Sequence, residues 1–428
     1  MRIAFVGGFA FSPKGTMRAR AYPLAAELVR LGHEVAIFLP PYDNLDDCGR
    51  VWEQDGVCIR NVGTERDRNV RGWSRLLLYF RMLSQVVRQV LRYRPDVVHL
   101  FKPKGFAGAA AAYFLLRAGP PVVLDCDDWE GWGGWNEIKS YPWAVKEYID
   151  RQERWLIKRA QAVTVASKTI EARVAKLRRD QNSVFYIPNC GASAEGRSIQ
   201  DAVRAQPREN VRREFGFGDH PVVLYSGHFE DRQSVDFFCR AAAPIAAKHR
   251  AIISFVGNDV PQSIIRPQFP PAAGAQLRFF PQLPYEDFLR LVWASDVAAF
   301  PYPDDLIHRA KCSARITDYM AMGKAVLTSA VGQNMEYIVD GESGLLAAPG
   351  DEQDFAAKLD HLLSVPEMRL MLGENARKRL QQKFDWAGDA VQQCLAAYHS
   401  VLKASRHGDL ASPEMTPKAA TQRNRSAA

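Results

Sequence analysis

Short apolar runs alternate with segments of helical periodicity along the first half of the chain. The runs fall at residues 2–6, 34–38, 97–100, 122–125, 162–166 and 184–187. Nearly unbroken apolar runs are typical of strands that are buried on both faces of a parallel sheet. The segment between the first two runs has helical spacing and ends at Gly32, and glycine commonly closes a helix. The pattern predicts a parallel sheet with helices on both faces.

The same alternation restarts after a polar stretch. Residues 193–211 are poor in large apolar side chains and rich in charge, which predicts an interdomain linker. Further apolar runs fall at residues 222–226, 252–256, 277–280, 297–300, 325–329 and 344–347. The fold class is therefore α/β, with a Rossmann-like domain over residues 1–192 and a second one over residues 212–384. Their strand ends are expected to face each other across a ligand-binding cleft.

Length and composition agree with two folded domains. The 428 residues exceed what one core usually supports, and 47% hydrophobic with 24% charged residues is typical of a globular chain. Residues 405–428 are polar, with little to bury, which predicts a disordered tail. The longest stretch of small apolar residues, 105–116, is shorter than the roughly 20 that span a bilayer, and the first residues do not resemble a signal peptide.

The seven cysteines are scattered and form no C-x-x-C pair. Free thiols in a reducing compartment fit this usage best. We therefore expect a cytoplasmic protein.

A basic helix is predicted in the first domain. Residues 60–94 hold nine arginines against only Glu65 and Asp67. At about 100° per residue, one face collects Leu76, Tyr79, Phe80, Leu83, Val86, Val87, Val90 and Leu91, and the other collects Arg71, Arg75, Arg81, Arg88 and Arg92. A solvated outer face and attraction to an anionic membrane surface both stay open. Nucleic acid is not an expected partner, because no nucleic-acid-binding motif accompanies the charge.

Two loops are candidates for binding an anionic ligand. The loop after the first strand ends in Gly15 and Thr16 and leads into a helix with Arg18; backbone amides at such a helix start favour anions. It has neither the dinucleotide fingerprint nor the P-loop ending, so a purely structural turn is the alternative. The loop after residues 222–226 holds Gly227, His228 and Arg232. Arg232 is the preferred cation there, because a guanidinium binds phosphate in bidentate geometry.

The most informative run begins at Lys311. It contains Asp318-Tyr319-Met320-Ala321-Met322-Gly323, then Gly332-Gln333-Asn334-Met335-Glu336, then Asp340-Gly341-Glu342-Ser343-Gly344-Leu345-Leu346. This succession resembles the C-terminal signature of glycosyltransferase family four, the retaining enzymes of the GT-B fold. The similarity extends back through Gly32-His33-Glu34-Val35 and Ile187-Pro188-Asn189 and covers nearly the whole chain to about residue 390.

The resemblance implies a donor site in the second domain. In the family, two acids eight positions apart bind the donor, the second at the ribose and the first at the sugar. Asp318 matches the second acid, but Ala310 stands where the first is expected. Asp304 or Asp305 could replace it. The resemblance also assigns Gly332, Gln333, Asn334 and Glu336 to the donor sugar and the reacting centre, and Lys311 joins Arg232 as a cation for the diphosphate.

The first domain is expected to present the acceptor. Asp127 and Asp128 lie where relatives carry a His-Asp pair near the acceptor, and either could contact an acceptor hydroxyl; helix capping is the equal alternative. The neighbouring Trp129, Trp132 and Trp135 could form a sugar-stacking or lipid-facing platform, or core. The family's last helix, expected at residues 385–404, crosses back to the first domain.

Together these features predict a retaining glycosyltransferase that moves a sugar from a nucleotide diphosphate donor to an acceptor hydroxyl, in polysaccharide, glycolipid or other glycoconjugate synthesis. No metal or other cofactor is expected, because protein cations can neutralise the diphosphate. The predicted location is the cytoplasm, with peripheral contact at the inner face of the membrane through the basic helix. A nucleotide-sugar epimerase of the same fold and a degenerate, non-catalytic partner are the alternatives.

Overall fold

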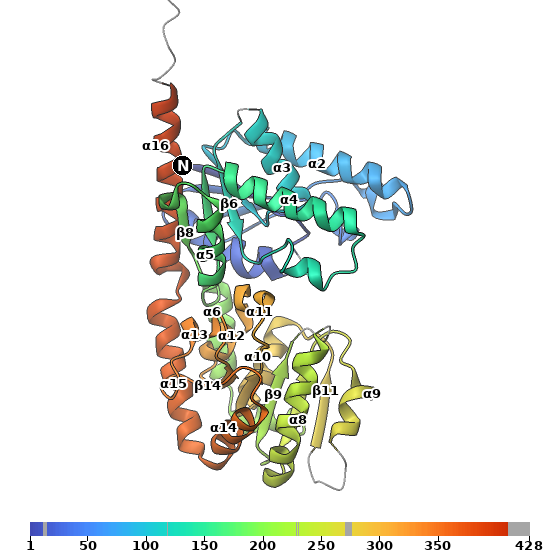
Figure 1. Ribbon diagram of the computed structural model, residues 1–428, viewed down its shortest axis with the longest axis vertical. Coiled ribbons are helices and arrows are strands. Elements are labelled where there is room, and N and C mark those ends of the chain that lie inside the picture. The colour runs from blue at the N-terminus through green and yellow to red at the C-terminus, as the bar shows by residue number, and fades with distance from the viewer. Residues whose placement is uncertain (12–14, 118, 228, 230, 270–275, 410–428) are drawn as a thin grey trace, which may run out of the picture.

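The chain forms two α/β lobes joined along one side by its last helices (Figure 1). A computed structural model describes residues 1–11, 15–117, 119–227, 229, 231–269 and 276–409, with the backbone alone at residues 404–409. Within this part of the chain, no helix combines the length and apolar character needed to cross a membrane.

The first sheet has eight strands in the order β3-β4-β2-β1-β5-β6-β7-β8. They are β1 (Arg2–Val6), β2 (Glu34–Leu39), β3 (Val51–Gln54), β4 (Val57–Asn61), β5 (Val97–Phe101), β6 (Val122–Cys126), β7 (Ala162–Val165) and β8 (Val184–Tyr186). All pairs are parallel except β3 with β4. The apolar-run pattern misses this hairpin, although Asp55-Gly56 at its turn is a strong hairpin signal; both turn residues have positive φ.

The second sheet has six strands in the order β11-β10-β9-β12-β13-β14. They are β9 (Val222–Ser226), β10 (Ile252–Val256), β11 (Gln276–Phe280), β12 (Val297–Phe300), β13 (Ala325–Ser329) and β14 (Leu345–Ala347). All are parallel, and β9 and β12 lie side by side although other elements separate them in sequence. The chain order reverses there, so the carboxyl ends of β9 and β12 open a crevice for ligands.

The helices flank the two sheets. In the first lobe they are α1 (Tyr22–Arg30), α2 (Ser74–Tyr93), α3 (Gly105–Leu116), α4 (Trp143–Arg159) and α5 (Lys168–Leu177). The second lobe has α8 (Arg232–His249), α9 (Gln262–Ile265), α10 (Tyr285–Ala294), α11 (Leu306–Ala310), α12 (Ala314–Ala321), α13 (Asn334–Tyr337), α14 (Glu352–Ser364) and α15 (Pro366–Lys383).

The stretch expected to be a polar linker is instead helical. It forms α6 (Ala194–Arg204) and α7 (Arg208–Glu214), and both pack on α10. Its charged residues have structural partners: Arg208 and Arg212 bind the two carboxylate oxygens of Asp296 at 2.7 and 3.1 Å. The ion pairs of Arg208 and Arg212 with Asp296 therefore hold α7 on the second lobe.

The chain returns to the first lobe through α16 (Val391–Asp409), which packs on β6, β7 and β8. The His99 ring in β5 lies 2.9 Å from the hydroxyl of Tyr398 on this helix, and both residues are buried. The helix continues to Asp409, past the predicted start of the tail at residue 405. Residues 410–428 of that predicted tail lie outside the described residues.

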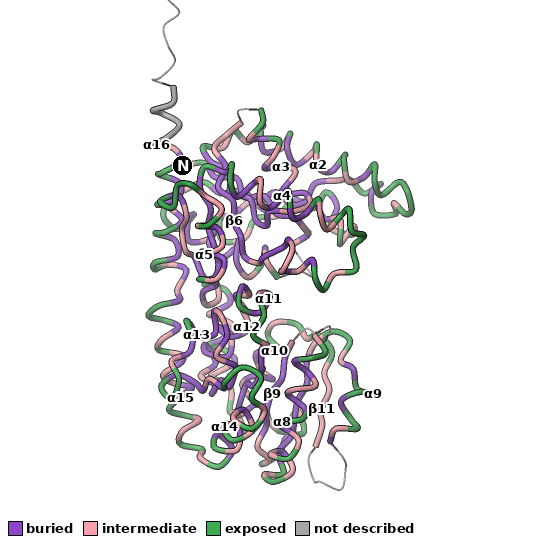
Figure 2. Tube along the Cα trace, viewed as in Figure 1, coloured by how far each residue is buried: buried purple, intermediate pink, exposed green. Residues whose placement is uncertain are grey.

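The basic helix α2 has buried and exposed residues along its length (Figure 2), and the predicted core face is confirmed only at Val86, Val87 and Val90. Its buried residues are Leu78, Met82, Val86, Val87 and Val90, whereas the predicted core residues Leu76, Phe80 and Leu91 are exposed. Leu78, Met82, Val86 and Val90 follow one another at intervals of four residues and therefore lie in one row along the helix. The helix α2 packs on the core along that row. Its first two turns consequently leave large apolar side chains in solvent.

A buried ion pair connects the loop after β1 to the carboxyl end of β6. Nε and Nη2 of Arg20 donate to the two carboxylate oxygens of Asp125 at 2.8 and 2.6 Å. Nη1 of Arg20 donates to the carbonyl oxygen of Ile187 and to the side chain of Asn189, beyond β8. Burial alone would raise the pKa of Asp125, but the charge of Arg20 lowers it. Arg20 is therefore a structural cation and is not available to a ligand.

Replacing Arg20 tests this assignment. Arg20→Ala leaves the carboxylate of Asp125 buried without its counter-charge, and we expect the free energy of unfolding to fall by about 3–5 kcal/mol. Urea unfolding followed by circular dichroism measures the loss. Arg2→Ala is the matched control, because the Arg2–Glu34 pair is solvent-exposed and such pairs contribute little. Equal effects of the two substitutions would contradict the structural role.

Candidate active site

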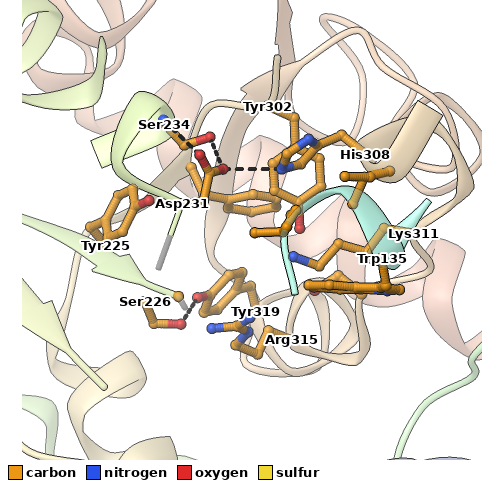
Figure 3. A pocket seen from close by; sticks show the side chains of 15 residues that line it. Trp135, Tyr225, Ser226, Asp231, Ser234, Tyr302, His308, Lys311, Arg315 and Tyr319 are labelled. Atoms are coloured by element: carbon orange, nitrogen blue, oxygen red, sulfur yellow. Dashed lines mark hydrogen bonds and ion pairs between the residues drawn. The ribbon is translucent and has the colours of Figure 1, made fainter. Parts of the chain in front are cut away.

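A cleft lies between the lobes at the carboxyl ends of β9 and β12 (Figure 3). It encloses about 640 Å³ of space, including the part open to solvent. Its wall is formed by Trp135, Ile138, Tyr225, Ser226, Gly227, Asp231, Ser234, Phe300, Tyr302, Ile307, His308, Lys311, Ser313, Arg315 and Tyr319. Trp135 and Ile138 belong to the first lobe, and all the others to the second. The cleft therefore occupies the crevice that the strand order of the second sheet creates.

His308 on α11 is held between two carboxylates. Its Nε2 lies 3.1 Å from Asp231, which caps α8, and its Nδ1 lies 2.9 Å from Asp305, which caps α11. Burial would lower the pKa of His308, but the hydrogen bonds to both carboxylates outweigh burial and raise it. Burial would likewise raise the pKa of Asp231, and its bonds to His308 and Ser234 lower it to about 2. The ring is held by both carboxylates, and this clamp fixes α11 against the start of α8.

Two further cations face the cleft from the adjoining segment. Nζ of Lys311 lies 5.1 Å from the centroid of the Tyr302 ring, and Arg315 on α12 lies beside Tyr319 in the wall. The Tyr319 hydroxyl is bonded to that of Ser226 at the end of β9. Lys311 and Arg315 thus bring two positive charges to the strand ends, where an anionic group would be bound most strongly.

Asp318 lies one helical turn beyond Arg315, outside the wall of the cleft. Its carboxylate accepts hydrogen bonds from the Tyr285 hydroxyl at 2.8 Å and from the Gln200 amide at 3.4 Å. Withdrawal from water raises its pKa to about 6, although these bonds and the charges of Arg18 and Arg315 act in the opposite direction. Arg18 belongs to the first lobe, so both lobes contribute charge around this carboxylate.

The first lobe supplies a cluster of acids around one lysine. Nζ of Lys102 lies 2.9 Å from Asp127, 2.7 Å from Asp128 and 3.1 Å from Glu130. The Thr16 hydroxyl donates to Asp127 at 3.1 Å. Burial raises the pKa of Asp127 to about 6 in spite of Lys102. Burial would also raise the pKa of Asp128, but Lys102 and a hydrogen bond from the Trp135 side chain outweigh burial and lower it.

Asp128 therefore links this cluster to the cleft. Trp135 forms part of the cleft wall, and the charge of Lys311 also lowers the pKa of Asp128. The three tryptophans considered together in the sequence have different surroundings: Trp129 is core, Trp132 donates to Glu147, and of the three Trp135 lines the cleft.

Several predicted donor residues lie elsewhere. Arg232 is exposed at the first position of α8 and is not part of the wall, while its neighbour Asp231 is. Gly15 is exposed at the start of the helical segment that carries Thr16. Gly227 lines the cleft, and His228 lies outside the described residues.

The loop of Gly332, Gln333, Asn334 and Glu336 also lies outside the cleft wall. Gln333 bridges the lobes through the Tyr186 hydroxyl, and Asn334 is buried against Thr328. Gly332 packs so closely on the backbone of Arg309 that a Cβ would lie 2.3 Å from the Arg309 carbonyl oxygen. Close packing and interlobe bonding thus hold Gly332, Gln333 and Asn334, whereas Glu336 is exposed.

The acids considered as replacements for the missing first acid have partners of their own. Asp304 is bound by the guanidinium of Arg309 and is exposed. Asp305 holds His308 and reaches the cleft only through it. Ala310, at the expected position of that acid, is buried. Among the described residues, no group of three or more His, Cys, Asp and Glu side chains is arranged to hold a metal ion.

Two family models match the chain. The family model described as Glycosyl transferase 4-like domain matches residues 15–190, and the model described as Glycosyl transferases group 1 matches residues 207–379. The chain belongs to the group 1 glycosyltransferases. This enzyme is 24% identical to a D-inositol 3-phosphate glycosyltransferase of Thermobispora bispora, over 88% of each chain. It is 23% identical to the alpha-D-kanosaminyltransferase of Streptomyces kanamyceticus, over 67% of this chain and 73% of that one.

Solved structures show that the glycosyltransferase has the GT-B fold. Sucrose-phosphate synthase from Thermosynechococcus elongatus superposes with a TM-score of 0.67 at 19% identity, covering 96% of this chain and all of that one. Anabaena HepE in complex with UDP and glucose superposes with a TM-score of 0.66 at 18% identity, covering 94% of this chain and 100% of that one.

The sequence indicates part of the glycosyltransferase's cleft and misses part of it. Lys311 and Gly227 are predicted and line it, whereas Asp231, His308 and Arg315 are not predicted as site residues. The spacing Asp305-x-x-His308 is a helix-capping signal. It indicates that His308 lies one turn inside a helix, but not that Asp231 meets it.

The pH dependence of stability tests the His308 clamp. A raised pKa means that protonated His308 stabilises the fold fully below the unfolded value of about 6.5, and that this contribution is lost as pH rises through the folded value. We expect His308→Gln to cost more stability at pH 6 than at pH 9, because Asp231 stays ionised throughout this range. Urea unfolding at both pH values measures the difference. His361→Gln on α14 is the control, and a cost for His308→Gln that does not change with pH would contradict the protonated clamp.

Proposed function

We propose that the enzyme transfers a sugar from a nucleotide diphosphate donor to an acceptor hydroxyl, with retention of the anomeric configuration. The observation that supports this best is the charge of the cleft: cations stand at the strand ends of the second lobe, opposite the acid cluster of the first. An anionic leaving group and a hydroxyl that must lose a proton need those two environments side by side.

The donor is proposed to lie on the second lobe. Lys311 and Arg315 would face the diphosphate, and Asp318 would accept hydrogen bonds from the ribose hydroxyls. Arg232 and His228 remain proposed contacts of the phosphate loop, and Gly332, Gln333, Asn334 and Glu336 those of the sugar. Gly15, Thr16 and Arg18 would close over the donor from the first lobe. The named complexes of HepE with UDP and with UDP-glucose make uridine nucleotides the first donors to test.

The chemical step breaks the bond between the anomeric carbon and the diphosphate oxygen, which keeps the electron pair. A new bond forms from that carbon to the acceptor oxygen on the same face of the sugar, and the acceptor proton leaves that oxygen. Asp127, with its pKa raised to about 6, is the proposed acceptor of this proton, while Lys102 keeps Asp128 ionised beside it. The protein cations would neutralise the diphosphate without a metal ion.

The proposed place of action is the cytoplasm, at the inner face of the membrane. Seven cysteines without a disulfide among the described residues fit a reducing compartment. The basic helix α2 supports contact with anionic lipid.

Transfer from radiolabelled sugar nucleotides to a cell extract tests the function directly. A labelled glycoconjugate formed from one donor, with the anomeric proton coupling of the donor kept in the product, is the expected result. Free epimerised sugar without any acceptor would instead indicate a nucleotide-sugar epimerase. Absence of both transfer and nucleotide binding would leave only a non-catalytic partner.

Asp318 offers a test of donor binding. We expect Asp318→Asn to weaken the affinity for the cognate nucleoside diphosphate roughly 10- to 100-fold, since a hydrogen bond to a charged group contributes about 1.5–3 kcal/mol. Isothermal titration calorimetry measures the change. Asp287→Asn on α10 is the matched control, because Asp287 is exposed on the same lobe and pairs only loosely with Arg290. Unchanged affinity in Asp318→Asn would count against the ribose contact.

The pH profile of transfer tests Asp127. At saturating donor, we expect the transfer rate to rise as pH passes about 6, because only ionised Asp127 can accept the proton. Asp127→Asn should remove this rise and lower the rate by roughly 100-fold or more. Asp128→Asn should keep a rise, shifted in pH because Asp127 loses a neighbouring charge. A rise that persists unchanged in Asp127→Asn would assign the proton transfer to another group.

A further inference from the structure

Large apolar side chains are exposed together on one side of the first lobe, at the beginnings of α2 and α4. Trp73, Leu77 and Trp143 are 93%, 74% and 70% exposed. With them stand Leu76, Phe80, Tyr141, Val145 and Tyr148, each at least 40% exposed. We refer to these eight residues as the α2–α4 face. Single exposed apolar residues are ordinary, but a group of this size marks a surface that binds something.

The two helix starts lie close in space because α3 joins them. α3 packs on both α2 and α4, and all three lie on the same side of the lobe in Figure 1. Tyr79 of α2 stacks on Phe106 of α3 with ring centroids 4.1 Å apart. Burial raises the pKa of Tyr79 to about 12, and the nearby phenol of Tyr148 on α4 adds to that rise. The α2–α4 face is therefore one surface.

The surroundings of this face are basic. Residues 70–94 contain six arginines and no acidic residue, and Arg71, Arg75, Arg88 and Arg92 are exposed. The acids nearest in sequence are already engaged: Asp67 is buried against Arg81, and Glu147 is bound by Arg151 and Trp132. The face thus combines an apolar centre with tryptophan, tyrosine and arginine. Proteins that bind at the headgroup level of an anionic bilayer have this composition.

The same segment that forms part of the face also lines the catalytic cleft. Trp135 and Ile138 are in the cleft wall, Tyr141 and Trp143 follow within a few residues in the α2–α4 face, and Ile138 is itself 41% exposed. Exposed apolar side chains thus recur along the segment that leads from the cleft wall to the face. A water-soluble acceptor needs no such path, whereas an amphiphilic one does.

We propose that the α2–α4 face docks on an anionic lipid bilayer, and that the acceptor hydroxyl is carried by an amphiphile in that bilayer. The inference rests on the proposed transferase function and names its acceptor class. Docking seats Trp73, Leu77 and Trp143 among the headgroups, and the exposed arginines bind lipid phosphates. The segment 135–148 then leads the head of the acceptor past Trp135 toward Asp128.

Co-sedimentation with vesicles tests docking without reference to catalysis. The full chain is expected to sediment with vesicles of phosphatidylcholine and phosphatidylglycerol at 0.1 M salt, but not with pure phosphatidylcholine, and to be partly released at 0.5 M salt. The double variant Trp73→Ser/Leu77→Ser should bind at least tenfold more weakly. Leu370→Ser/Met371→Ser is the matched control, because these side chains are 73% and 50% exposed on α15 of the other lobe, and its binding should equal that of the wild type.

Transfer assays then separate this inference from the proposed function. With a lipid-extract acceptor in anionic vesicles, Trp73→Ser/Leu77→Ser should lose at least tenfold in transfer, while its affinity for nucleoside diphosphate stays that of the wild type. Equal transfer by the variant, or equal sedimentation of the variant and the wild type, would overturn the docking. A concentration-dependent dimer that the double variant abolishes would assign the face to a second copy of the chain instead. If the wild type binds no nucleotide, the proposed transferase function is refuted. The sedimentation result still decides whether the face docks on a bilayer.

Discussion

The arrangement of the two lobes depends on one buried ion pair, Arg20 with Asp125. Because Asp125 ends β6 and Arg20 follows the loop after β1, the pair fixes the strand ends of the first sheet around a charge that cannot reach water. The same guanidinium holds Asn189, and Asn189 in turn donates to the carbonyl oxygen of Cys312 at 2.6 Å and accepts from the Tyr337 hydroxyl through its own carbonyl at 2.5 Å. A continuous chain of hydrogen bonds thus runs from the first sheet into the segment that precedes α12. The position of Lys311 and Arg315 relative to the first lobe follows from it.

The cleft assembles opposite charges from opposite lobes. The second lobe contributes Lys311 and Arg315, for which the described residues show no ion pair. The described acids nearby are bound to His308 or, in Asp318, to Tyr285 and Gln200. The first lobe contributes three acids that share Lys102. Burial raises the pKa of Asp127 to about 6, whereas Lys102 lowers the pKa of Asp128. Asp127 and Asp128 are adjacent, and burial would raise the pKa of both. Their pKa values shift in opposite directions because burial prevails at Asp127, whereas the contacts with Lys102 prevail at Asp128.

Much of the fold could be predicted because buried parallel strands are unbroken apolar runs, and β1, β9 and β13 begin and end where those runs do. The β3–β4 hairpin was missed since neither strand is an unbroken apolar run: the edge strand β3 alternates between exposed and half-buried residues, and β4 alternates between buried and more exposed ones. Residues 193–211 were predicted to be a polar linker because charge was interpreted as solvent exposure, whereas the segment forms helices and its Arg208 binds Asp296. In the site, Asp318 stays a predicted donor contact outside the cleft wall, and Lys311 follows from an ordered motif. His308 with Asp231 does not, because their meeting requires α8 and α11 to pack together, a contact between residues 77 positions apart.

The helix α16 completes the first lobe from the far end of the sequence. It covers β6, β7 and β8, and the Tyr398 hydroxyl is the partner of the buried His99 ring. During synthesis, the first 190 residues therefore leave the ribosome with an apolar sheet face uncovered and with Nδ1 of His99 lacking its native partner. Both stay so until almost 400 residues have been made. The first lobe cannot be expected to reach its native stability as a nascent chain or as an isolated fragment, and the order of synthesis makes the second lobe the first part of this enzyme able to close its own core.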